Sequence, residues 1–455
     1  MKGVDGREQD VDLDQESMSN SIDVSNAMED TPEQYADRIR NALTGTIKSE
    51  SKVLLAVAWV TDAQRRMLAL FPEALCADVM FKSNAEQRPL FSIDGKTSEN
   101  ETFRALHAFM PSTCRFVYQW LFSVAVPKLH SRRHLRRNEV MGLDGEERQY
   151  SAFISTIPTV FPKSTHILCS WHLFDRGQKE NGVNLSLVDN KNHVQGKAYM
   201  MVLRMWLFSW TDSVESRSEF EISYKLLLEW LQSSELMSVF PSLLVERIKD
   251  YLAKSVVPHL DKILFLNRMR HRCFDMWTTS NSEAENSVVK RHPVGPRPNE
   301  SLDKATKALT QIGESRLLKK EQSAALALDT IPTVGYKQGI HDQLTNHAAN
   351  LVMIQYDQQS QYVLYHLDEQ TFYVKRKHHY APTATNWSEG NFGLYMVPSF
   401  ERTRIVTMVN HGISQYLLCS CCYFERHGIG CRHMYKVLKR DPMAYDIAVR
   451  WHKGF

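Results

Sequence analysis

Long hydrophobic stretches are absent from this chain of 455 residues. Its longest apolar runs, such as residues 53–60, fall far short of the ~20 residues that a membrane-spanning helix needs. The first 30 residues are acidic and polar, and they contain no apolar segment typical of a secretory signal. These absences exclude the membrane class, and we expect no membrane partner.

Cysteine is scarce as well, with eight residues in the chain, half of them in one short segment near the C-terminus. A long chain without a secretory signal rarely depends on disulfides, so a disulfide scaffold is excluded. Clustered cysteines in such a chain indicate metal binding. They also favour a reducing compartment, the cytosol or the nucleus.

The first 33 residues lack aromatic side chains and hold ten acidic residues against two basic ones. A segment so charged and so poor in apolar residues cannot build a core, so residues 1–33 are predicted to form a disordered acidic tail. The whole chain has a net charge of +3. The rest of it therefore carries a modest positive excess, which suits an anionic partner.

Hydrophobic periodicity predicts a mixed α/β fold. Strands are expected over residues 75–83, 89–93, 102–110, 139–143, 165–170, 394–397 and 405–409. Helices are expected over residues 64–70, 115–129, 148–157, 282–290 and 301–328, with a helical block at 195–267. The helical stripes that carry Trp120, Trp206, Trp210 and Trp230 are assigned to the core. This order predicts a mixed sheet with flanking helices and a helical insertion.

Four potential metal ligands stand close together near the C-terminus as C-x-C, nine residues, then C-x-H: Cys419, Cys421, Cys431 and His433. Zinc takes four thiolate or imidazole ligands, and a structural site fills all four positions with protein. The turn at residues 428–430 brings the second pair back, and a helix is expected to follow His433. Cys422 and His427 are interpreted as a packed thiol and a surface imidazole, although either could substitute as a ligand.

This pattern resembles the SWIM zinc finger, as do the surrounding residues from Phe424 to His433. The resemblance implies a small, zinc-stabilised module, ββα-like in form, that contacts nucleic acid or protein. Buried thiols that cluster without a metal are the simpler alternative.

Three acidic residues lie in contexts similar to the Mutator-like (MULE) transposase family: Asp78, Asp144 and Glu283. Asp78 lies on a predicted strand, which is followed by an Asn-containing turn and Pro-Leu. Asp144 lies between a strand and a predicted helix, although an Asp-Gly pair is also a common turn former. Glu283 stands in an S-E-x-x-N pattern with Asn286. Between the last two acids, Cys169 and His172 match the C-x-x-H pair of the family.

The resemblance implies a ribonuclease H-like fold in which the two aspartates lie on adjacent strands and the insertion precedes the glutamate helix. It implies that Asp78, Asp144 and Glu283 hold catalytic Mg²⁺ or Mn²⁺, with Cys169, His172 and Asn286 in supporting roles. Hard cations of this kind prefer carboxylate oxygens, and a pair of them can activate both oxygens of a phosphodiester exchange. The implied partner is the DNA of transposon ends, the implied location the nucleus, and a homodimer is one expected state.

The combined interpretation divides the chain into five segments. These are the tail 1–33, a ribonuclease H-like transposase domain 34–300 with its insertion at about 190–275, a connecting region 301–393, a SWIM-type finger 394–445 and a C-terminal tail 446–455. Within the domain, Ser282 and Glu285 form a capping-box pattern, which leaves Glu283 free to point elsewhere.

Three basic runs are candidate phosphate contacts. They comprise Arg132, Arg133, Arg136 and Arg137 in the first, residues 268–272 in the second, and Lys375, Arg376 and Lys377 at the start of the third. A solvated face explains each run equally well.

Two departures from the family pattern keep a second function open. Met80 replaces the Thr that the family usually has, and the first fifty residues contain neither Cys nor His, so an N-terminal zinc-containing DNA reader is not expected there. The alternative to an active transposase is therefore a domesticated, non-catalytic nuclear protein. In that case the finger and the basic surfaces bind DNA or protein and regulate transcription.

Overall fold

The structure is a computed structural model that describes residues 33–34, 37, 54–143, 157–274, 276, 280–327, 336–377, 402–411, 414–438 and 447–452. Apart from residue 33, the predicted acidic tail lies outside the described residues. The same holds for the strand expected at 394–397 and for all but the last residue of the helix expected at 148–157. Within the described part, no helix is long and apolar enough to cross a membrane.

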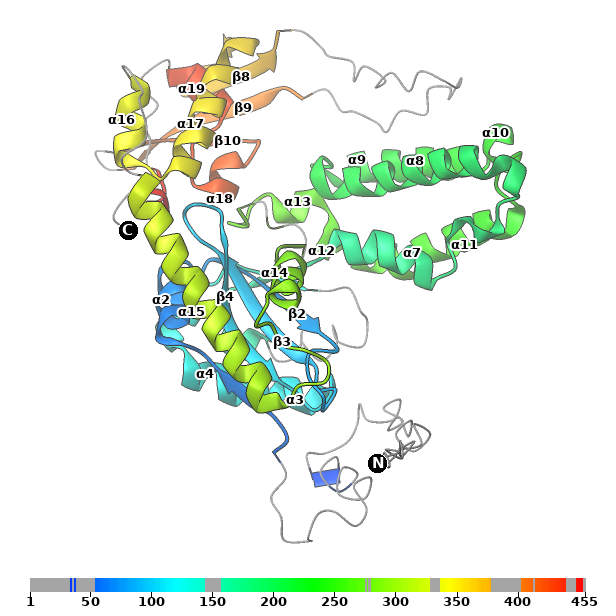
Figure 1. Ribbon diagram of the computed structural model, residues 1–455. Helices are drawn as coiled ribbons and strands as arrows, with labels where there is room; N and C mark the ends of the chain where they lie inside the picture. Colours follow the sequence, from blue (N-terminus) through cyan, green and yellow to red (C-terminus); the bar gives the residue numbers. More distant parts are fainter. Residues whose placement is uncertain are drawn as a thin grey trace, which may run out of the picture.

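A mixed six-stranded sheet forms the centre of the first half of the chain (Figure 1), with strand order β1-β4-β3-β2-β5-β6. The first four of these strands pair antiparallel, whereas β5 and β6 continue the sheet parallel to β2. The strands are β1 Val57–Trp59, β2 Ala74–Met80, β3 Leu90–Lys96, β4 Thr102–Phe109, β5 Val140–Leu143 and β6 Thr165–Leu168. The predicted mixed α/β sheet and the β2–β3 hairpin are therefore confirmed.

The two faces of the sheet bury different side chains, because successive residues of a strand point to opposite sides. On β2, Leu75 and Ala77 join the large core beneath α3 Arg115–Trp120 and its continuation through a π-helical turn, Leu121–Ala125, into α4 Val126–Leu129. The alternate residues Ala74, Cys76 and Met80 belong to clusters on the other face. Asp78 is in register with this second set.

Helices α14 Ser280–Arg291 and α15 Leu302–Ala327 cover part of the second face. Val289 of α14 and Leu309 of α15 pack with Met80 in one buried cluster. Contacts of α14 with β2, β3 and β4 place this helix across the middle of the sheet. Both helices were predicted from the sequence, with α14 two residues longer at its N-terminus.

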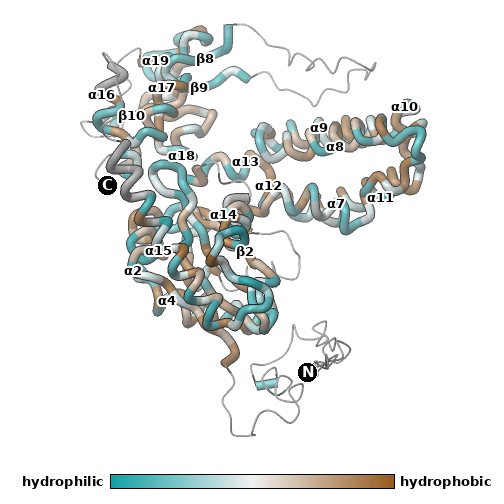
Figure 2. The backbone as a smooth tube through the Cα atoms, viewed as in Figure 1, coloured by the Kyte–Doolittle hydropathy of each residue, from teal (hydrophilic) through white to brown (hydrophobic). Residues whose placement is uncertain are grey.

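A helical arm projects from the sheet between β6 and α14 (Figure 1). Its main helices are α8 His193–Asp212, α9 Arg217–Leu231 and α11 Ser242–Tyr251. Apolar and polar residues alternate along these helices (Figure 2), as expected for helices that bury one face. Trp206, Trp210 and Trp230 are buried inside the arm as predicted, while Trp120 is partly buried against the same core.

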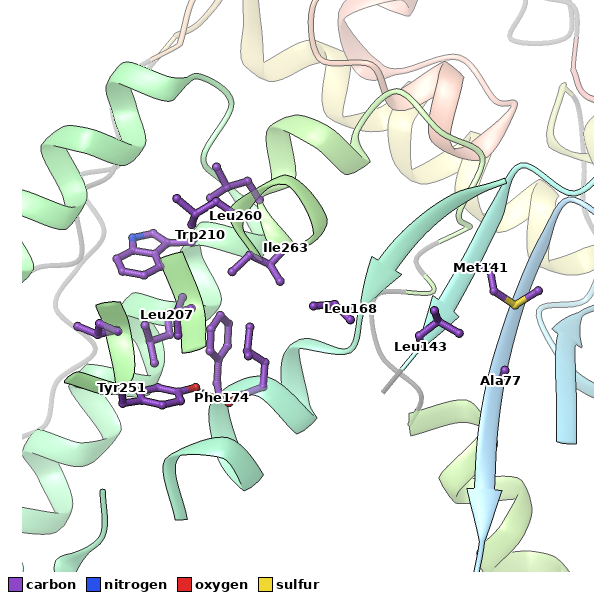
Figure 3. Packing of buried hydrophobic residues seen from close by; sticks show 14 of the residues in the cluster. Ala77, Met141, Leu143, Leu168, Phe174, Leu207, Trp210, Tyr251, Leu260 and Ile263 are labelled. Atoms are coloured by element: carbon purple, nitrogen blue, oxygen red, sulfur yellow. Dashed lines mark hydrogen bonds between the residues drawn. The ribbon is translucent and has the colours of Figure 1, made fainter. Parts of the chain in front are cut away.

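The core of the arm is continuous with that of the sheet (Figure 3). Leu143 and Leu168, at the ends of two strands, belong to the same buried cluster as Phe174, Trp210 and Ile263 of the arm. The indole N–H groups of Trp206 and Trp210 both donate to the Ser223 hydroxyl, at 3.0 and 2.8 Å, so α8 and α9 are also joined by polar contacts.

A second, four-stranded antiparallel sheet forms near the C-terminus, with order β10-β9-β8-β7. Its strands are β7 Tyr362–His366, β8 Thr371–Arg376, β9 Arg404–His411 and β10 Ser414–Cys419. Helices α18 Tyr423–His427 and α19 Arg432–Leu438 pack on this sheet, and α17 Asn346–Gln358 packs on α19. Strands from the predicted connecting region thus pair with strands of the predicted finger.

Residues 447–452 attach this C-terminal module to the central sheet. Arg450 Nη1 lies 3.0 Å from Glu73 Oε2, just before β2, and Arg450 Nη2 donates to the Lys96 carbonyl at the end of β3. Trp451 is buried and donates its indole N–H to the His427 carbonyl at 2.6 Å. The segment predicted as a tail therefore contacts both the central sheet and helix α18 of the C-terminal module.

Replacing Glu73 with Ala should destabilise the protein by about 3–5 kcal/mol, because the buried Arg450 guanidinium loses its counter-charge. Chemical denaturation measures this free energy. The matched control is Glu221→Ala, which breaks the exposed 3.4 Å pair with Arg217 and should cost less than about 1 kcal/mol. Equal losses in the two variants would contradict the assignment.

Candidate functional site

Four buried ligand atoms converge between β10, α18 and α19. Cys419, Cys421, Cys431 and His433 each offer one atom, and these atoms all lie within 4.8 Å of one another. Cys419 ends β10, and Cys421 lies in the following turn. Cys431 immediately precedes α19, and His433 lies in its first turn. The three thiols and the imidazole form the donor set that a closed tetrahedral zinc site requires.

The electrostatics of the four ligands also fit a cation. Hydrogen bonds from Cys419 and Cys431 lower the pKa of Cys421 well below its ordinary value, whereas burial raises that of Cys431. Without a metal, the ionised form is therefore favoured at Cys421 and disfavoured at Cys431. A divalent ion would favour all three thiolates together.

The two other candidate ligands lie outside this group. Cys422 has a left-handed backbone, with φ of 50°, and its sulfur is not among the converging atoms. His427 is buried rather than exposed, because its ring stacks on Tyr423 with centroids 4.1 Å apart. The prediction of a surface imidazole at His427 was therefore wrong.

Gly428 is required by the turn that returns the second ligand pair. Its φ of 65° is left-handed, and a Cβ there would lie 2.4 Å from the Ala448 Cβ. Only glycine avoids both the backbone strain and this clash.

Cys421→Ser should abolish zinc binding, lowering the content from about one zinc per chain to near zero, because three ligands do not close the site. Elemental analysis after gel filtration measures this. Cys422→Ser is the matched control, one residue away and outside the ligand group, and should keep its zinc. Full zinc occupancy in Cys421→Ser would refute the ligand set.

A second polar centre lies where α14 crosses β2. Asp78 is buried, with an exposure of 8%, on the face of β2 that α14 covers. Its Oδ2 accepts a hydrogen bond from the Asn286 side-chain amide at 2.7 Å, and its Oδ1 accepts one from the Val79 amide at 2.7 Å. Two predicted site residues, 208 positions apart in the chain, are thus in direct contact.

Glu283 lies in the first turn of the same helix and is partly exposed. Its Oε1 is 3.1 Å from Nε2 of His172, which follows β6 and starts the π-helical turn His172–Arg176. Cys169 is buried just after β6. Cys169 and His172 belong to no metal-ligand group among the described residues.

Asp144 itself lies outside the described residues, but the strand before it is described. β5 pairs parallel with β2, with Cys76 opposite Gly142. Asp78 follows Cys76 by two positions, and Asp144 follows Gly142 by two positions.

The N-terminus of α14 differs from the prediction. The helix begins at Ser280, so Ser282 is inside its first turn and is not an N-cap. The Ser282 hydroxyl lies 2.9 Å from the Cys76 sulfur on β2, and Glu285 forms an ion pair with Arg316 of α15. The capping-box interpretation was therefore wrong, because both side chains make contacts between elements.

The basic runs fall into two groups. Arg132, Arg133, Arg136 and Arg137 are exposed on and after α5 Arg132–Leu135, and Lys375, Arg376 and Lys377 are exposed at the end of β8. Arg268, in contrast, is 1% exposed and donates to the Leu168 carbonyl at 2.6 Å. Burial lowers its pKa to about 10. A phosphate contact by Arg268 is therefore excluded.

Two residues near the second centre had no motif in the sequence. Asp94 and Arg104 form a buried ion pair, with Oδ1 and Nε 2.8 Å apart, and Arg104 also contacts Asn286. The sequence contains only a weak signal for them, because each is a single charged residue between uncharged neighbours in a strand. Only the register of the two strands shows that they face each other.

Two known protein families match this chain, one over part of the central sheet and one over the zinc-ligand cluster. The sheet, its flanking helices and the Cys₃His cluster define a mixed α/β protein with a C-terminal zinc module. The model of the MULE transposase domain matches residues 74–176, and that of the SWIM zinc finger matches residues 418–441. The chain thus carries a MULE transposase domain followed by a SWIM zinc finger. None of the curated proteins matches it significantly.

Proposed function

We propose that the protein is a DNA transposase of the Mutator-like class, with a ribonuclease H-like catalytic domain. It cleaves phosphodiester bonds at transposon ends and then joins strands. The observation that carries this proposal is the contact between Asp78 and α14, the helix that also bears Glu283. This contact supports a shared metal site, because Asn286 and Glu283 are three positions apart on one helix.

The third carboxylate is Asp144. In the family the two aspartates lie on adjacent strands, and β2 and β5 are adjacent and parallel here. The equal spacing of Asp78 and Asp144 from the paired residues Cys76 and Gly142 supports their meeting at one end of these strands. The location of the helical arm between β6 and α14 agrees with the insertion of this family.

Oxygen ligands are what Mg²⁺ and Mn²⁺ prefer, so Asp78, Asp144 and Glu283 would hold these ions. Such a pair stabilises the attacking and leaving oxygens of an in-line displacement and lowers the pKa of a bound water or 3′-hydroxyl. Asn286 fixes the Asp78 carboxylate by donating to Oδ2. His172, 3.1 Å from Glu283, orients that carboxylate.

The finger and the exposed basic residues would supply contacts to DNA or to a protein partner. Lys375, Arg376 and Lys377 are exposed at the end of β8, in the same sheet as the zinc-ligand strand β10. Positive charges on one sheet suit the phosphate backbone. A DNA-processing protein with reduced thiol ligands would act in the nucleus.

Asp78→Asn should reduce metal-dependent cleavage and strand transfer by about 100-fold or more, because several kcal/mol of transition-state stabilisation depend on the metal ligands. The assay uses DNA with the terminal repeats that border the gene, with Mg²⁺ or Mn²⁺. Asp303→Asn, which breaks an exposed pair with Lys307, is the control and should keep full activity. Equal activity in wild type and Asp78→Asn would remove the catalytic assignment.

The alternative is a domesticated, non-catalytic regulator that keeps the fold. Met80 in place of the family's usual Thr is the observation that favours it, since this side chain packs near Asp78 on the same face of β2. The alternative predicts sequence-dependent DNA or protein binding by a zinc-loaded wild type that shows no cleavage in the assay above.

Whether the protein is a transposase or a non-catalytic regulator, its DNA binding should weaken when Lys375, Arg376 and Lys377 are replaced with Ala. Each lost phosphate contact should reduce the slope of log affinity against log salt by about 0.9, because fewer counterions are released. Fluorescence anisotropy over a salt series measures the slope. Zinc content serves as the folding control, and an unchanged slope would exclude these three side chains as phosphate contacts.

A further inference from the structure

A buried ion pair between Asp94 and Arg104 contacts Asn286 through the arginine. Asp94 of β3 and Arg104 of β4 are opposite each other in the antiparallel register, next to an irregularity between Ile93 and Asp94. Arg104 Nε donates to Asp94 Oδ1 at 2.8 Å, and the side chains are 5% and 0% exposed. Burial alone would lower the pKa of Arg104, but the charge and hydrogen bond of Asp94 raise it above its ordinary value.

Arg104 fixes the orientation of the Asn286 amide. Its Nη2 donates to Asn286 Oδ1 at 2.6 Å. A guanidinium has only donors, so the oxygen of the amide must face Arg104 and its NH₂ must face away. The NH₂ group then meets Asp78 Oδ2 at 2.7 Å. The opposite orientation would put NH₂ against the guanidinium and an oxygen against a carboxylate.

The four side chains form one continuous chain of hydrogen bonds from Asp94 through Arg104 and Asn286 to Asp78. They come from β3, β4, α14 and β2, and all four are buried. A buried ion pair gives little net stability compared with apolar residues of the same volume. The presence of the Asp94–Arg104 pair is therefore better explained by the orientation that Arg104 gives to the Asn286 amide than by a gain in stability.

We propose that Asp94 and Arg104 are positioning residues that orient Asn286, and through it hold Asp78 in the conformation that binds a divalent cation. This inference rests on the proposed function, because it assigns Asp78 to a metal site. It adds two residues that lie outside the acidic triad, the C-x-x-H pair and the zinc-ligand pattern.

The test is Mn²⁺ affinity of zinc-loaded protein, measured by electron paramagnetic resonance, with Asp78→Asn as the baseline for binding at this site. Mn²⁺ prefers oxygen ligands and so leaves the thiolate site to zinc. The main variant is Asp94→Leu with Arg104→Met, which removes both charges together and leaves no unpaired one in the core. We expect its Mn²⁺ affinity to fall about 10-fold or more, as for other partners of metal ligands.

Asn286→Leu is the second variant and should lose as much affinity as the double variant. Combining all three substitutions should cost no more than either alone, because both act through the same amide. Losses that add in the combined variant would overturn the inference. Asn286→Leu leaves the ion pair in place, so it still tests the inference if the double variant folds poorly: unchanged Mn²⁺ affinity in Asn286→Leu would overturn it.

Arg450→Met is the matched control. It removes another buried arginine, paired with Glu73 just before β2, and it contacts neither Asp78 nor Asn286. It should lose stability but keep wild-type Mn²⁺ affinity. Equal weakening in this control, or unchanged affinity in the double variant, would refute the positioning role alone. No Mn²⁺ binding by wild type above the Asp78→Asn baseline would refute the proposed function, and the inference with it.

Discussion

The second polar centre, which includes Asp78 and Asn286, depends on the packing of α14 across β2. It combines an apolar part, where Val289 packs with Met80, and a polar part, where Asn286 meets Asp78 and Ser282 meets Cys76. Burying polar groups is unfavourable unless they are hydrogen-bonded, so these pairs define one position of the helix rather than a range. Displacement of α14 would separate Asn286 from Asp78 and Ser282 from Cys76, and would leave buried polar groups without partners.

The zinc module packs directly against the central six-stranded sheet. Ile429 and Tyr435 of the finger belong to the same buried cluster as Ala74 and Cys76 of β2, so the module packs on the face that also carries Asp78. At the arm, Arg402 and Arg404 form ion pairs with Glu215 and Glu219. The finger is thus attached to both the sheet and the arm.

Local patterns predicted what local forces determine. The β2–β3 hairpin followed from alternation and a polar turn, the arm from apolar stripes, and the Cys₃His group from ligand spacing. Errors arose where a partner distant in sequence decides the outcome. The sequence around Ser282 has the pattern of an N-cap, but the Ser282 hydroxyl instead contacts the Cys76 sulfur. Arg268 lies in a basic run typical of a surface, but it is buried and donates to the Leu168 carbonyl. Asp94 and Arg104 could not be paired without the register of β3 and β4.

The ion pair between Glu73 and Arg450 has a consequence for how the protein is made. The two residues are 377 positions apart, so at about 5–20 residues per second the ribosome needs roughly 20–75 s to deliver the arginine after the glutamate. During that interval the carboxylate just before β2 has no Arg450 beside it. Residues 447–452 therefore complete a structure whose first strands emerged long before them.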